Sequence, residues 1–112
     1  MANTFKSVTS GSIGTGLTDV YTCPGSTTTI VLGASMSNTT VNPIGGSIKL
    51  AKNGTSAGQD DVFVVKNAPV PAGSSIEVMA GNKVVMQASD KLQFQSDTAD
   101  SLDSIVSILE IT

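Results

Sequence analysis

The sequence contains no histidine, no arginine and no tryptophan, and its one cysteine is Cys23. Without an imidazole, no serine or cysteine has the usual general base, and one cysteine alone supplies no zinc site. A single cysteine also forms no intrachain disulfide. We therefore predict a protein that is not an enzyme, with no catalytic residues, no metal ligands and no cofactor.

Charge is scarce as well. Charged residues make up 13% of the chain, and the net charge is -3. The six Lys are scattered singly, whereas nucleic-acid binding needs clustered lysine and arginine. This pattern predicts no nucleic-acid partner. The neutral polar surface that remains suits a protein packed beside many copies of itself, and it suits a plain Ser/Thr-rich β-domain equally well.

Long apolar runs are missing too. The longest, residues 29–34, is far short of the roughly 20 residues that span a bilayer. Residues 1–7 lack the basic and apolar stretches of a secretory signal peptide. The sequence therefore predicts no membrane segment, no signal peptide and synthesis in the cytoplasm.

The residues that are abundant favour strands. Ser and Thr contribute 28 of the 112 residues, and Val, Ile and Leu contribute 26. The length suits one hydrophobic core, so we predict a single β-sandwich domain over residues 1–112. Runs of period two predict eight or nine short strands and no long helix. The expected strands cover residues 4–10, 18–22, 27–37, 46–51, 61–66, 75–79, 83–88, 91–95 and 103–111.

The expected fold class is all-β, an antiparallel β-sandwich that is immunoglobulin-like or jelly-roll-like. Alternation in strands such as 91–95 marks buried positions. The predicted core consists of Val20, Ile30, Leu32, Ile48, Leu50, Val64, Ile76, Val78, Val85, Leu92, Phe94, Ile105 and Leu109. Residues 62–65 and 105–111 are apolar on both faces, so each strand is either central or covered by a partner chain. Of the two, the C-terminal strand is the better candidate for a protein interface.

The connections carry turn signals. Asn53-Gly54 and Gly81-Asn82 predict tight hairpins, and Pro24 with Gly25 predicts a turn. Residues 67–73 contain two prolines and predict an extended crossover between sheets.

Two groups of acidic residues are candidates for chemistry. Asp97, Asp100 and Asp103 lie in or beside a polar loop between two expected strands, but their spacing does not match an EF-hand. A weak Ca²⁺ site and a plain solvated loop both remain open there. Asp60-Asp61 fits the start of a strand better than catalysis, because adjacent strand residues point to opposite faces.

Five segments in this order resemble a family of roughly 110-residue virion structural proteins of tailed bacteriophages, especially of marine and cyanobacterial phages. The resemblance covers nearly the full chain. Its carriers are residues 2–6 (ANTFK), 19–24 (DVYTCP), 65–75 (VKNAPVPAGSS), 79–83 (MAGNK) and 107–112 (SILEIT).

The resemblance implies a location in the virion and a capsid decoration, or cement, protein that stabilises the outer head shell. Its partners would be the major capsid protein and further copies of itself, with a trimer as the expected oligomer. Neck, collar or tail structural proteins remain an alternative. A carbohydrate-binding module is an alternative of another class, although the chain has few aromatics to stack on sugars. The candidate interface residues are Phe5 and Val8 in the first strand and Ile108 and Ile111 in the last.

Overall fold

The structure, a computed structural model, describes residues 3–52, 60–78 and 83–112. These residues contain nine strands and no helix, which confirms the all-β prediction. Every expected strand is present, with ends shifted by a few residues. The strands are β1 Asn3–Ile13, β2 Thr18–Thr22, β3 Thr28–Asn38, β4 Ile44–Ala51, β5 Val62–Val70, β6 Ser75–Glu77, β7 Val84–Met86, β8 Lys91–Ser96 and β9 Leu102–Ile111.

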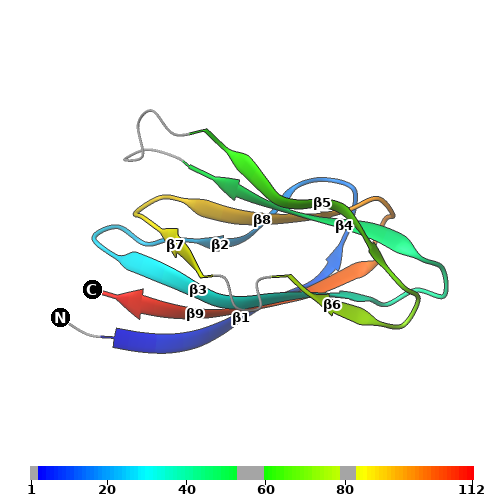
Figure 1. Cartoon of the computed structure of the whole chain (residues 1–112), viewed down its shortest axis with the longest axis horizontal. Helices are drawn as coiled ribbons and strands as arrows, with labels where there is room; N and C mark the ends of the chain where they lie inside the picture. The colour runs from blue at the N-terminus through cyan, green and yellow to red at the C-terminus, as the bar shows by residue number, and fades with distance from the viewer. Residues whose placement is uncertain (1–2, 53–59, 79–82) are drawn as a thin grey trace.

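Two antiparallel sheets face each other (Figure 1). Sheet A has the order β1-β9-β3-β6, with β7 also paired to β3, and sheet B has the order β2-β8-β4-β5. The first strands of the chain pair with the last ones in reverse order. β1 pairs with β9, β2 with β8, β3 with β6 and β7, and β4 with β5. A long hairpin rolled up in this way is a jelly roll. Of the two strand orders left open by the sequence, the jelly-roll order is the one found.

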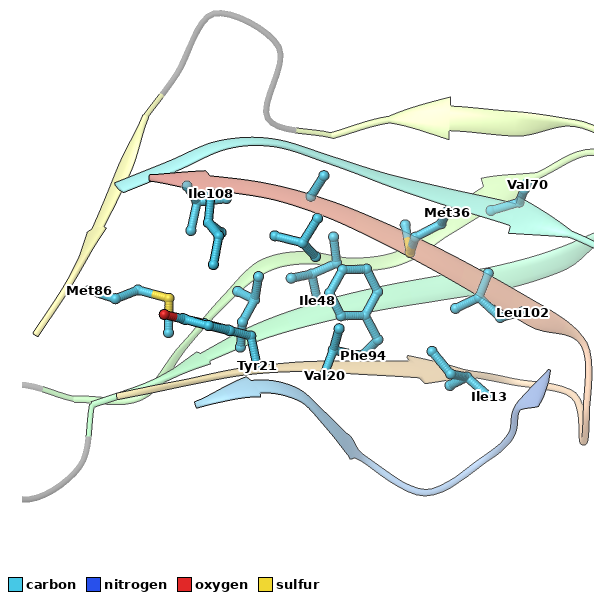
Figure 2. Packing of buried hydrophobic residues seen from close by; sticks show 14 of the residues in the cluster. Ile13, Val20, Tyr21, Met36, Ile48, Val70, Met86, Phe94, Leu102 and Ile108 are labelled. Atoms are coloured by element: carbon cyan, nitrogen blue, oxygen red, sulfur yellow. The ribbon is translucent and has the colours of Figure 1, made fainter. Parts of the chain in front are cut away.

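The core lies between the sheets (Figure 2). Phe94 and Ile48 are in its middle and are fully buried. Val20, Ile48, Leu92 and Phe94 are buried as predicted. Leu50, Ile76 and Val78 are partly buried against the same cluster.

The predicted core is wrong at three exposed positions, and Leu109, Ile30 and Leu32 are half-buried and lie outside the core cluster. Val64, Val85 and Ile105 are 36%, 53% and 49% exposed. In β9 the alternation runs the other way, because the even-numbered residues face inward. The inward set of β9 is Leu102, Ser104, Val106, Ile108 and Glu110.

A β-bulge in β3 explains a similar error. Between Val31 and Gly33 the pairing with β9 shifts, so the buried positions change from odd to even. Val31, Ala34 and Met36 are buried, whereas Ile30 and Leu32, both expected in the core, are only half-buried.

The positions of β5 and β9 answer the question that their two-sided apolar pattern raised. β9 is central, between β1 and β3, whereas β5 is the edge strand of sheet B. The predicted crossover over residues 67–73 is wrong in its first half, because β5 continues to Val70. Pro69 is tolerated there since an edge strand has one unpaired side.

The predicted hairpin turns at residues 53–54 and 81–82 lie outside the described residues. The turn after β2 falls one residue later than expected, at Gly25 and Ser26, where Ser26 has a φ of 58°. Asn3 pairs with Ile111, so the two ends of the described chain lie at the same end of the molecule (Figure 1). In the described ranges, no helix has the length and apolar character needed to cross a membrane.

Candidate functional site

An apolar row crosses the outer face of sheet A. Phe5 in β1 pairs with Leu109 in β9, Leu109 pairs with Ile30 in β3, and Ile30 pairs with Val85 in β7. Directly paired residues point to the same face of a sheet, so these four side chains form one line across four strands. We call Phe5, Leu109, Ile30 and Val85 the sheet A row.

The sheet A row is open to solvent. Phe5 is 73% exposed and Val85 is 53% exposed, while Leu109 and Ile30 between them are half-buried. An exposed phenylalanine side chain beside other apolar groups costs hydration free energy that a contact with another molecule would recover. This line is therefore the best candidate for an interface in the described part of the chain.

In β1, β9 and β3, the residues on either side of the row are uncharged. Toward the chain ends, Asn3, Ile111 and Thr28 are paired across the same three strands, and in the other direction Ser7, Ser107 and Gly33 follow. Two acidic residues occupy this face farther along the strands. Glu77 is paired with Ser35, and Asp103 is paired with Ser37.

The outer face of sheet B is different in character. Asp19 accepts a hydrogen bond from Gln93 Nε2 at 2.7 Å and lies 3.3 Å from Lys91 Nζ. Phe63 on this face lies beneath two ammonium groups, with Lys66 Nζ 4.6 Å and Lys49 Nζ 5.8 Å from the ring centroid. Polar groups on sheet B are thus paired with one another, so this face has less need of a partner.

The four predicted interface residues do not share one face. Phe5 lies on the outer face in the sheet A row, and Ile111 is half-buried on the same face next to it. Val8 and Ile108 point inward, where Ile108 is fully buried and Val8 packs against the core. Ile108 is therefore part of the protomer's own core and does not reach its surface.

The last strand cannot offer a free edge to another chain. β9 is bonded to β1 on one side and to β3 on the other, so no edge of β9 is left for a strand of another chain to pair with. β1 is the outermost strand of sheet A.

A buried polar cluster lies on the inner side of the same two strands. Tyr21 donates its hydroxyl proton to Glu110 Oε2 at 2.6 Å, and the Thr29 hydroxyl lies 2.8 Å from the Tyr21 oxygen. Lys6 Nζ is 2.9 Å from Glu110 Oε1. Lys6 and Glu110 follow Phe5 and Leu109 directly in sequence, so the inner cluster fixes the backbone that carries the outer row.

The environment of the cluster shifts two pKa values. The hydrogen bond from Tyr21, followed by the one from Lys6, lowers the pKa of Glu110 below its usual value. Burial, followed by the hydrogen bond to Glu110, raises the pKa of Tyr21. Glu110 is therefore ionised and Tyr21 is neutral at neutral pH.

Acid is expected to weaken the fold through Glu110. Its pKa is lower in the folded chain than in the unfolded one, so its stabilisation is present above the unfolded value and is lost as pH falls through the folded value. We expect Glu110→Gln to lower the free energy of unfolding by about 1.5–3 kcal/mol at pH 7, with a smaller difference at pH 3. Urea unfolding curves at both pH values measure this.

Glu77→Gln is the matched control for that comparison, because Glu77 is an exposed glutamate outside the cluster. Its unfolding curve should stay close to that of the unmodified protein at pH 7. A Glu110→Gln variant that loses stability on acidification as steeply as the unmodified protein would contradict the assignment.

Of the three aspartates considered for a Ca²⁺ site, Asp97 and Asp103 have separate partners. Asp103 Oδ1 accepts a hydrogen bond from the Ser12 amide at 3.0 Å, and Asp97 Oδ1 accepts one from the Thr98 hydroxyl at 3.0 Å. Within the described residues, no three acidic, histidine or cysteine side chains gather closely enough to hold a metal ion. The open hollow beside Asp103, of about 350 Å³, is lined by Thr9, Ser10, Gly11, Ser37, Asp103, Ser104 and Ile105.

Comparison with known proteins yields a likeness of fold. No family model matches the sequence. No curated protein sequence matches it either. Among solved structures, the chain is similar to one in the crystal structure of the T13 IBDV viral particle, with a TM-score of 0.60 and 10% sequence identity. The shared feature is the sandwich. The match covers 96% of this chain and 30% of the viral chain, so the chain spans less than a third of the protein that it matches.

Sequence reasoning found one member of the sheet A row, Phe5, and missed three. Ile30, Val85 and Leu109 had been expected in the core. The two-sided apolar pattern of residues 105–111 was the signal that could have identified Leu109, since one of its two faces must lie outside.

Proposed function

We propose that this chain is a non-enzymatic structural protein of a virion, a capsid decoration protein of the tailed-phage type that binds the outer head shell. The observation that carries the proposal is the uncovered sheet A row on a jelly roll. Its location would be the virion, after synthesis in the host cytoplasm, and its partner would be the major capsid protein.

The fold supports this role. Jelly rolls are recurrent building blocks of viral capsids, and they occur in lectins as well. The solved chain with the same sandwich belongs to the T13 IBDV viral particle. The sequence segments that resemble phage virion proteins add a second line of support, independent of the backbone.

The proposed mechanism is burial of surface without turnover. A decoration protein stabilises a shell by binding the assembled state more tightly than the separated subunits, so that binding free energy adds to shell stability. A rigid sandwich suits this task, because little conformational freedom is lost when it binds. The salt bridges and hydrogen bonds of sheet B keep its outer face compatible with solvent.

The aromatic side chains favour the shell over the glycan alternative. Tyr21 and Phe94 are buried, and Phe63 lies beneath Lys49 and Lys66. Phe5 remains as an exposed ring, and its neighbours in the row are aliphatic, whereas sugar sites combine stacked rings with polar groups that fix orientation.

Copy number in the particle tests the proposal. Particles of the virus that encodes this chain would be purified, and the chain would be quantified against the major capsid protein by gel densitometry. We expect a ratio near one, or near one to three, and release on mild dissociation of the shell. A handful of copies per particle would assign it to the neck, collar or tail instead. Absence from the particle would overturn the virion role and favour glycan binding.

A further inference from the structure

We infer that the sheet A row is a contact between two copies of this chain, which pack face to face around a two-fold axis that runs along the row. In this arrangement the outer faces of two sheet A layers meet, and Phe5 of one copy lies against Phe5 of the other. The pairing does not require the virion role and would hold for the isolated protein.

The chemistry of the face selects the occupant. A partner for the row must present a largely uncharged apolar strip of matching length, because the row and the residues on either side of it in β1, β9 and β3 carry no charge, and Lys83 stands only at the far end, before β7. A second copy of this chain carries such a strip, because it has the same sheet A row. A two-fold axis brings the two rows together. A strongly charged partner would have to leave its charges unpaired against Phe5, Leu109 and Ile30.

The placement of the acidic residues then selects the axis. Glu77 and Asp103 lie about four to six residues from the row, or on the order of 14–20 Å along the strands. An axis along the row reverses the strand direction, so the acidic end of one copy faces the uncharged end of the other, around Asn3 and Thr28. An axis parallel to the strands would bring the two Asp103 carboxylates close together, and like charges disfavour it.

The available area is sufficient for a reversible dimer. Three strand spacings and about ten residues of strand length describe a face of roughly 500 Å² per copy. Two such faces bury on the order of 1,000 Å², an area typical of weak, transient interfaces. Packed sheets in protein interiors meet in the same way, about 10 Å apart.

This symmetry differs from the trimer that the family resemblance implies. A three-fold axis would bring the row of each copy against a different surface of the next. In the described part of the molecule, sheet B exposes large apolar side chains on its edge strand β5, at Val62, Phe63 and Val64, and two lysine ammonium groups lie over Phe63. The rest of its outer face carries paired polar groups, so sheet B complements the row less well than a second row does.

Sedimentation velocity of the isolated protein, from about 1 µM to about 100 µM, tests the inference. We expect a concentration-dependent shift from the mass of one chain, 11.3 kDa, to twice that mass. Phe5→Glu should weaken dimerisation about 100-fold or more, because two carboxylates would then face each other. Val85→Glu, at the other end of the row, should have the same effect through the same repulsion.

The matched control is Val41→Glu. Val41 is 90% exposed, but it lies in a loop outside the sheets, so this variant adds the same charge without touching the row. It should dimerise like the unmodified protein. Circular dichroism of all three variants checks that each one folds.

Charge pairing tests the axis itself. A mixture of Phe5→Glu and Phe5→Lys should form a mixed dimer, because the axis along the row places position 5 against position 5. A mixed dimer of Phe5→Glu with Val85→Lys instead would overturn that axis. A protein that stays at 11.3 kDa up to about 100 µM, or that forms a trimer, would overturn the two-copy contact. Neither result would alter the copy number measured in particles, so the proposed function is tested separately.

Discussion

Replacing Asp90 with alanine is expected to lower the free energy of unfolding by about 3–5 kcal/mol. Asp90 is fully buried, and its Oδ2 accepts hydrogen bonds from Lys52 Nζ at 2.6 Å and from the Gln87 amide at 2.9 Å. The Lys52 side chain is itself only 9% exposed. Without the carboxylate, the ammonium group would remain in a largely dry site with its main partner removed. Urea unfolding at pH 7 measures the loss.

Asp19→Ala is the matched control for Asp90→Ala. Asp19 also pairs with a lysine, Lys91, but both side chains are partly exposed, at 45% and 33%. Surface pairs of this kind contribute about 0–1 kcal/mol. The double variant Lys52→Met with Asp90→Leu should recover much of the loss, since it leaves no unpaired charge. Equal effects of Asp90→Ala and Asp19→Ala would contradict a structural role for the buried pair.

Phe94→Ala should be comparably destabilising, by about 3–5 kcal/mol. Phe94 is the largest of the fully buried side chains and lies between the two sheets, beside Ile48 (Figure 2). Its removal leaves a cavity that the paired strands on either side cannot close without breaking register. The midpoint of urea unfolding should fall with little change in slope.

Phe63→Ala serves as the comparison for Phe94→Ala, because it removes the same atoms from the outer face of sheet B. Phe63 is 38% exposed and contacts lysine side chains. We expect a loss of about 1 kcal/mol there. A Phe94→Ala variant as stable as Phe63→Ala would contradict a central position of Phe94 in the core.

The strands could be predicted from sequence because each leaves a local signal. Alternation of Leu92 and Phe94 with glutamines, and turn residues between the runs, depend on neighbours within a few positions. Even β6 and β7, two short strands that both pair with β3, are predicted as separate strands. The jelly-roll order depends on which distant strands pair, and no local pattern contains that information.

Which face of β9 is buried could not be predicted from the sequence, and the reason is physical. A strand with apolar residues on both faces gives no sign of which face is buried, and a shift of one position exchanges the two sets. Glu110 favours the wrong choice of face, because a carboxylate is rarely buried and its position would therefore be expected to face outward. Its inward position is possible because Lys6 balances its charge and Tyr21 donates a hydrogen bond to it.

The row itself was only partly predictable. Phe5 could be recognised as a candidate from its place in the first strand, but its alignment with Leu109, Ile30 and Val85 follows from three separate strand pairings. Each of these joins residues far apart in the chain. Interfaces assembled from several strands in this manner become visible once the register is known.

The pairing of β1 with β9 also sets the order in which the protein can fold. Residues paired across these strands lie about 90 to 110 positions apart, and in the described chain β9 is the one strand that pairs with β1. During synthesis β1 must therefore wait until β9 has left the ribosome. Closing so long a loop is entropically costly and slow. Until then Phe5 is carried on an unpaired, weakly charged strand, so the nascent chain is most prone to aggregate through the same residue that forms the contact in the finished molecule.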